Sequence, residues 1–191
     1  MGGAYGAAGI GGNADALSYT YGSVGSTDID GTKYGTGTII IKGGTIAAEG
    51  GAYWVPQLRE YLGGAGIGTG LYGIGGTIEI LGGTITAEGG KRTGAGIGGG
   101  NGGSVDTIVI GGKNSEAPNI TVSSYNNGES GYLGAAIGSG WNGGDGLQLS
   151  CGDIQILSGS VEVTGGNIGY GVLKPCLLYT SPSPRDRTRS R

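Results

Sequence analysis

The chain has 191 residues, of which 50 are glycine, and its 11 basic and 14 acidic residues set a formal net charge of −3. Collagen is excluded because glycine follows no third-residue period and only five prolines occur. Recurring isoleucines argue against a wholly disordered chain, and no apolar run approaches the roughly 18 residues of a transmembrane helix, so no membrane span is expected.

The chain begins within a glycine-rich repeat, MGGAYGAAGIGG, whose A-G-I-G element carries Ile10. A signal peptide needs a basic segment followed by a hydrophobic one, and this stretch has neither. We therefore expect Met1 to be an internal methionine and the chain to be part of a longer repeat protein.

Residues 13–35 form a polar insertion in which Asp28 and Asp30, followed by a glycine, resemble the start of a calcium-binding loop. Closely spaced carboxylates supply the hard oxygen ligands that Ca²⁺ prefers. The terminal glutamate of such a loop is missing, so Asp28 and Asp30 are either metal ligands or ordinary turn residues. The sequence leaves both interpretations open and indicates no cofactor other than calcium.

Residues 37–51 (GTIIIKGGTIAAEGG) recur almost unchanged as residues 76–90 (GTIEILGGTITAEGG), at an offset of 39 residues. Each copy holds two short alternating runs separated by a Gly-Gly pair. Alternation at period two places the isoleucines on one side and residues such as Thr77 and Glu79 on the other, which is typical of a strand. Because such a unit cannot bury its apolar side alone, it must stack on its neighbours.

Residues 52–62 (AYWVPQLREYL) interrupt the glycine-rich text with three aromatic residues, and we expect a turn or a single helical turn there. The candidate ligand contacts are Tyr53, Trp54 and Tyr61, with Trp141 from a later insertion. Flat rings on a rigid scaffold can stack against sugar rings. The competing interpretation is that these rings shield the glycine-rich edge of the fold by local packing.

Three sets of apolar residues recur along the chain and define successive coils. They are Ile10, Ile67, Ile97 and Ile137 in the A-G-I-G elements; Ile39, Ile78, Ile108 and Ile154 in the first strands; and Ile46, Ile85, Ile120 and Val161 in the second strands. Three short strands per turn predict an all-β fold, a right-handed parallel β-helix or three-faced β-solenoid. We expect about four coils and the start of a fifth at residues 166–171, in one domain over residues 1–175 that is open at both ends.

Glu49 and Glu88 hold equivalent positions in successive coils, and we expect them to stack about 4.8 Å apart. The third and fourth coils place Ser123 and Thr164 at this position, so no longer acidic ladder is predicted. The two carboxylates are either solvated or bridged by a cation.

The repeats stop at Pro175, and residues 176–191 (CLLYTSPSPRDRTRSR) differ in composition from everything before them. Residues 176–186 resemble a translated sequencing-library adapter of the transposase type. We therefore expect this segment to be a non-native, disordered tail that packs on nothing. Without it, Cys151 is the one cysteine of the repeat region, which indicates neither a disulfide framework nor a redox compartment.

The tail holds four of the 11 basic residues and one of the 14 acidic ones, so residues 1–175 carry a formal charge of −6. An acidic chain with seven scattered basic residues lacks a phosphate-binding surface, and nucleic acid is not an expected partner. The chain has no histidine, which removes most general-base schemes, and no paired carboxylates recur on one face. We expect no enzymatic activity.

The A-G-I-G-G-G…G-T-I-x-I-x-G-G-T-I-x-A-x-G-G pattern resembles the repeats of large secreted or wall-attached bacterial β-helix proteins, within the broad pectate-lyase-like superfamily. The resemblance implies an extracellular or cell-surface location and a structural or adhesin-like module that makes contacts through its insertions. The alternative is a module that binds a polysaccharide or a host or cell-surface glycan, assisted by calcium or not. A polysaccharide lyase or hydrolase scaffold is the third hypothesis.

Overall fold

A computed structural model describes residues 6–12, 36–56, 59–113, 116–125, 133–141, 150–171 and, for the backbone, 178–180. These segments form strands joined by turns, with no α-helix among them. None of the described segments is therefore a helix of the length and apolarity that crossing a membrane requires. The all-β prediction is confirmed.

Each of three parallel sheets takes one strand from each successive coil. Sheet A contains, in spatial order, β1 (Ile10–Gly11), β6 (Ile67–Gly68), β9 (Ile97–Gly98), β12 (Ile137–Gly138) and β15 (Ile168–Gly169). Sheet B contains β2 (Thr38–Ile41), β7 (Thr77–Ile80), β10 (Thr107–Ile110), β13 (Asp153–Ile156) and β16 (Leu178–Thr180). Sheet C contains β3 (Thr45–Glu49), β8 (Thr84–Glu88), β11 (Asn119–Ser123) and β14 (Ser160–Gly165).

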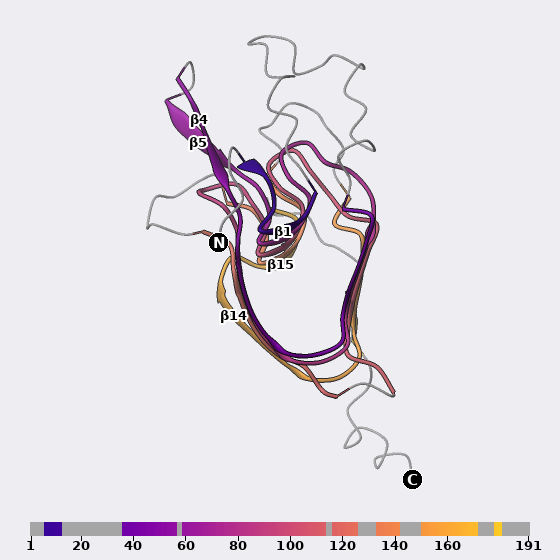
Figure 1. The fold of residues 1–191 in the computed structure, drawn as a ribbon. Coiled ribbons are helices and arrows are strands. Elements are labelled where there is room, and N and C mark those ends of the chain that lie inside the picture. The colour runs from indigo at the N-terminus through magenta and orange to yellow at the C-terminus, as the bar shows by residue number, and fades with distance from the viewer. Residues whose placement is uncertain are drawn as a thin grey trace.

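The chain visits sheets A, B and C in turn and then returns to A, which is the connectivity of a parallel β-helix. In Figure 1 the coils overlie one another, so that β1 and β15 appear at nearly the same place although they lie at opposite edges of sheet A. The predicted fold is confirmed. The right-handed winding rests on the general preference of parallel crossovers.

The predicted isoleucine ladders are in register across the sheets. Ile39, Ile78, Ile108 and Ile154 pair in succession in sheet B, and Ile46, Ile85, Ile120 and Val161 pair in succession in sheet C. Ile10, Ile67, Ile97, Ile137 and Ile168 form the third ladder in sheet A. Every second residue of a strand points inward, so one repeated apolar position becomes one continuous row of the core.

The core side chains are most completely buried in the middle coils. Ile78, Ile85 and Ile108 are completely buried, whereas Ile39 and Val161 in the outer coils are only partly buried. Full burial of such a side chain stabilises the fold by about 1.5–3 kcal/mol. The outward residues Thr84 and Thr86 of β8 are exposed, as the period-two alternation predicts.

The corner after sheet C differs from the prediction in the fourth coil. Glu49, Glu88 and Ser123 pair in succession as expected. Ser123 then pairs with Gly165 and not with Thr164, because the register of β14 shifts by one residue after Val163. A β-bulge of this kind inserts one extra residue in one strand, which no repeat count can foresee.

Residues 52–62 fold as an antiparallel β-hairpin, so the expectation of a turn or a helical turn is wrong. Strand β4 (Ala52–Val55) pairs with β5 (Glu60–Gly63), and the pair projects from the stack of coils (Figure 1). Tyr, Trp and Val favour extended backbone, which explains the strands. The turn between them was not recognisable because a left-handed residue is usually glycine or asparagine, and here it is Arg59 with φ of 53°.

The expectation that residues 176–191 pack on nothing is wrong for the three residues of this tail that the structure describes. Leu178–Thr180 form β16, which pairs in parallel with β13 at the edge of sheet B. An open edge presents unpaired backbone groups to any segment able to extend beside it. Cys151 is buried and takes part in a disulfide whose partner lies outside the described residues.

Candidate functional site

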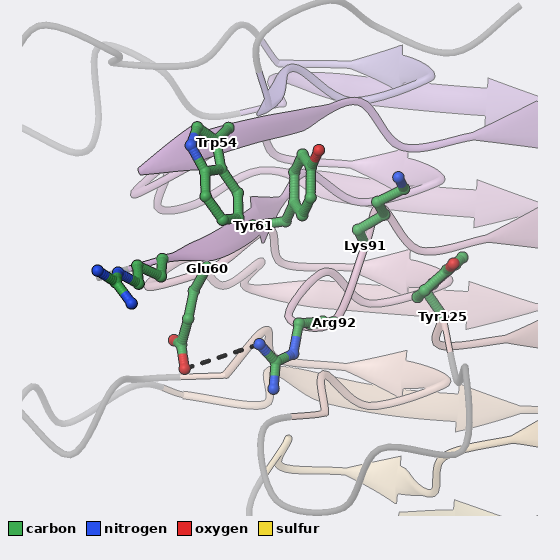
Figure 2. Close-up of a pocket in the computed structure, with 7 residues that line it drawn as sticks. Trp54, Glu60, Tyr61, Lys91, Arg92 and Tyr125 are labelled. Atoms are coloured by element: carbon green, nitrogen blue, oxygen red, sulfur yellow. Dashed lines mark ion pairs between the residues drawn. The ribbon is translucent and has the colours of Figure 1, made fainter. Parts of the chain in front are cut away.

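The corners that lead from sheet C to sheet A carry the polar and aromatic insertions of this chain. The hairpin β4–β5 is the insertion between β3 and β6. Residues 91–93 lie in the connection from β8 to β9, and Tyr125 lies in the connection from β11 to β12. Because equivalent corners of a β-helix stack like its strands, side chains from three successive coils meet in one pocket (Figure 2). Its lining residues are Trp54, Arg59, Glu60, Tyr61, Lys91, Arg92 and Tyr125.

The hairpin is anchored by a small apolar cluster of its own. Val55 and Leu62 are almost completely buried and pack with Leu71 and Tyr72, which follow β6. Tyr53 is partly buried against the same cluster. The hairpin is therefore held against the second coil by side chains, and its exposed rings are presented on a fixed support.

Trp54 and Tyr61 are directly opposed in the hairpin and form the aromatic wall of the pocket. Their ring centroids are 4.8 Å apart at an interplanar angle of 55°. Trp54 is 44% and Tyr61 37% exposed, which makes them two of the few large apolar side chains that the described surface leaves open. Such a pair offers a flat apolar surface beside the polar edges of Trp and Tyr.

The next corner, residues 91–93, is tied to the base of the hairpin by hydrogen bonds. The Gly63 N–H donates to Thr93 Oγ1 at 2.7 Å, and this threonine is buried. The Thr93 carbonyl accepts from the Trp141 N–H of the following coil at 2.9 Å. Thr93 therefore connects the base of the hairpin to the following coil through its side chain and its carbonyl.

Lys91 and Arg92 project from this corner toward the hairpin (Figure 2). The Lys91 ammonium lies 4.5 Å from the centroid of the Tyr61 ring, a cation–π arrangement. Arg92 Nη1 lies 3.7 Å from Glu60 Oε1, and both side chains are partly buried. The pocket has a volume of about 280 Å³.

The described residues that line the pocket carry more positive than negative charge. Arg59, Lys91 and Arg92 line it, and Glu60 is the one carboxylate among its described lining residues. The Arg92–Glu60 contact is the one ion pair among the described residues, which leaves Lys91 and Arg59 without a carboxylate partner in that part of the chain. The basic residues are therefore not scattered as the sequence indicated, because three of them converge here.

Two of these cations occupy backbone positions that glycine normally takes. Arg59 has φ of 53° and Arg92 has φ of 68°, and Tyr72 is the third described non-glycine residue with a positive φ. A side chain in this region strains the backbone by about 1 kcal/mol or more. Glycine fills the remaining positive-φ positions of the described residues apart from Tyr72, so the two strained arginines at one pocket stand out.

The structure brings together two of the four predicted contact residues. Trp54 and Tyr61 line the pocket, Tyr53 packs against the apolar cluster under the hairpin, and Trp141 lies below Thr93 without lining the pocket. Asp28 and Asp30 lie outside the described residues. Within the described ranges, no three His, Cys, Asp or Glu side chains gather closely enough to hold a metal ion.

Sequence reasoning missed Lys91 and Arg92 as members of the site and treated Tyr125 as one exposed ring among several. The sequence did contain a signal for Lys91 and Arg92, because they are adjacent cations in an otherwise glycine-rich corner. The corner precedes an A-G-I-G element, as does the corner that carries residues 52–62. Aligning the corners, and not only the strands, would have predicted the convergence.

No protein-family model, no curated protein and no solved structure matches this chain. What the chain does must therefore be inferred from the side chains that the fold brings together.

Proposed function

We propose that this chain is a non-catalytic module of an adhesin-like surface β-helix protein, and that it contacts its target through a carbohydrate-binding pocket at the β4–β5 hairpin. The exposed Trp54–Tyr61 pair is the observation that carries this proposal. If the hairpin served only to shield the edge of the fold, its largest ring would be turned inward. Instead the aliphatic Val55 and Leu62 are buried and the rings are left open.

The chemistry of the pocket favours sugar over a purely apolar ligand. A pyranose ring presents C–H groups to an aromatic face and hydroxyl groups at its rim, and the pocket combines rings with charged hydrogen-bonding groups. Its volume of about 280 Å³ lies near the lower limit of roughly 300 Å³ for small-molecule sites. This size fits one or two sugar units of a longer glycan.

The non-catalytic assignment rests on the composition of the lining. Glycoside hydrolases need two carboxyl groups at a fixed separation, and among the described residues Glu60 is the one carboxylate that lines this pocket. Glu60 is also engaged by Arg92. A polysaccharide lyase or hydrolase is therefore the less supported assignment for the described part of the chain.

The second candidate is a structural stalk whose pocket binds nothing. The continuous isoleucine ladders favour it, because they provide stiffness and length independently of any ligand. Both candidates, the glycan-binding module and the stalk, include membership of the pectate-lyase-like superfamily and a secreted or cell-surface location. The membership and the location rest on the resemblance of the repeats.

A glycan array separates the two candidates. The full chain is tested beside Trp54→Ala and Tyr61→Ala, with Ile40→Ala as a control that removes an exposed apolar side chain outside the pocket. We expect the wild-type chain and the control to retain a glycan and both pocket variants to lose it. If no glycan is retained by the wild-type chain, the stalk assignment stands and the binding proposal is withdrawn.

A chelator added to the same array tests the role of calcium. The pocket residues include no group of carboxylates, so we expect retention to survive the chelator. Loss of retention in chelator would assign a metal to the site, and Asp28→Asn with Asp30→Asn would then test the one acidic pair that the sequence indicates.

A further inference from the structure

The cations of the pocket point to a ligand with a negative charge, a property that the aromatic wall does not require. Three cations face one carboxylate across a small cavity, in a chain whose formal charge is −3. A neutral sugar needs none of them, since hydroxyl groups are served equally well by Asn, Gln or backbone groups. Both arginines are also held in strained backbone conformations that glycine would relieve.

Glu60 shows what kind of group the pocket accepts. Its carboxylate lies 3.7 Å from the Arg92 guanidinium, a loose contact that is longer than the 2.7–2.9 Å of a charge-assisted hydrogen bond. A ligand anion free to approach at shorter range can replace it. Because the Lys91 ammonium stands over the Tyr61 ring, a sugar ring that packs against the neighbouring Trp54 meets this second cation at its edge.

We propose that the pocket binds an anionic saccharide, whose carboxylate or sulfate group contacts Arg92 and Lys91 while its ring packs against Trp54. Arg59, which also lines the pocket, adds to the positive field. Glu60 competes with the ligand anion for Arg92. This inference rests on the proposed carbohydrate-binding function and adds the charge class of the ligand.

Single-stranded nucleic acid also combines stacking bases with anionic groups, and it is less well matched. A nucleic-acid site tracks the backbone along a positive groove over several nucleotides. Here the three cations surround one small pocket, and the acidic residues of the chain outnumber the basic ones.

The test uses three polymers with one backbone: dextran, carboxymethyl dextran and dextran sulfate, together with a thymidine oligonucleotide. Binding of the full chain to each is measured by surface plasmon resonance at two salt concentrations. The variants are Lys91→Ala, Arg92→Gly and Glu60→Gln, and Lys42→Ala removes an exposed lysine that does not line the pocket. Glycine is chosen at position 92 because it relieves the positive φ while removing the guanidinium.

We expect the wild-type chain to bind at least one charged dextran about tenfold more tightly than dextran itself, the effect of one charge-assisted hydrogen bond. Lys91→Ala and Arg92→Gly should each remove most of that preference, and Lys42→Ala should not. Glu60→Gln should tighten binding several-fold, since it removes a carboxylate that competes with the ligand anion. Higher salt should weaken charged-polymer binding and reduce the effect of each variant.

The melting midpoint of Arg92→Gly distinguishes a ligand role from a structural one. Because the substitution relieves a strained backbone position, we expect a midpoint within a few degrees of the wild-type value while binding is lost. Unfolding of this variant would assign Arg92 a structural role, and the decision would then rest on Lys91→Ala and Glu60→Gln.

Four outcomes overturn the inference, and they differ in what they leave standing. Equal binding of all three dextrans, or charged-dextran binding unaffected by Lys91→Ala and Glu60→Gln, removes the anion preference and leaves the proposed sugar-binding function intact. Preferential binding of the oligonucleotide assigns a different class of partner. If no saccharide binds here or on the glycan array, the proposed function fails and the inference fails with it.

Discussion

The last glycine of each A-G-I-G element, the second residue of each sheet A strand, is required by the close approach of successive coils. Gly68, Gly98 and Gly138 have φ between 134° and 141°, and a Cβ atom on any of them would overlap the carbonyl oxygen of the next coil's equivalent glycine. Elsewhere the requirement is absent: Gly43 has an ordinary φ and open space where a Cβ would stand. The high glycine content therefore has different causes at different positions.

Gly98→Ala should destabilise the fold by about 2 kcal/mol or more, because it combines a positive φ with a clash against backbone that cannot move aside. Gly43→Ala, the control, should be neutral or slightly stabilising because alanine reduces the entropy of the unfolded chain. Urea denaturation of both variants measures the difference. Equal stabilities would show that the coils separate easily at sheet A.

Ile80→Asp should abolish the fold. The side chain of Ile80 is completely buried in β7, and a carboxylate there would lack any partner, at a cost of several kcal/mol against a total stability of about 5–15 kcal/mol. Thr86→Asp on the exposed side of β8 is the matched control and should cost about 1 kcal/mol or less. Far-ultraviolet circular dichroism distinguishes them, and a folded Ile80→Asp chain would contradict the assigned core.

At the scale of elements, the hairpin β4–β5 buries its aliphatic side chains and exposes its aromatic ones. Val55 and Leu62 hold it against the second coil, whereas Trp54 and Tyr61 face the pocket. The strands of the β-helix itself cannot do this, because their inward residues form the core and their outward residues form regular rows. An insertion at a corner is free of both constraints, so it can bury one set of side chains and expose another.

Leu62→Ala should lower the free energy of unfolding by about 2–5 kcal/mol, because it opens a cavity in the cluster under the hairpin. Trp54→Ala should lower it by only about 1 kcal/mol, the value of one tilted ring pair at an exposed site. Chemical denaturation monitored by circular dichroism measures both. A loss for Trp54→Ala as large as that for Leu62→Ala would favour the packing interpretation of the ring.

At the scale of the whole molecule, the β-helix is an array whose coils contact mainly their neighbours. Its stability is therefore approximately a sum over coils and the interfaces between them. The partial burial of the outer ladder positions Ile39 and Val161 agrees with this, because a coil at the edge has a neighbour on one side only. Strand β16 occupies such an edge in sheet B.

Deleting residues 176–191 should lower the melting midpoint, because the deletion removes the partner of β13 and a cysteine of the chain. For a chain of this size each kcal/mol of lost stability corresponds to about 2–4 °C. Differential scanning calorimetry under oxidising and reducing conditions separates the contribution of the strand from that of the disulfide. An unchanged midpoint would restore the expectation that this segment packs on nothing.

The sequence alone determined the strands, their inward faces and their order in three parallel sheets. These features repeat, and a period of two within a strand together with a near-constant spacing between coils specifies which residues pair. Ile39, Ile78, Ile108 and Ile154 could be assigned to one ladder because each is fixed by its own local pattern and by the same pattern one coil away.

Only the tertiary structure decided the hairpin and the pocket. The turn at Arg59 uses a left-handed residue that no local rule assigns to arginine, so the strands on either side could not be joined from the sequence. The pocket gathers residues more than 30 positions apart in the sequence: Trp54, Lys91 and Tyr125. They meet because each coil of the β-helix returns the chain to the same corner, displaced by one strand spacing. The irregular corners repeat neither in length nor in composition, so their convergence follows from the winding and not from any pattern within them.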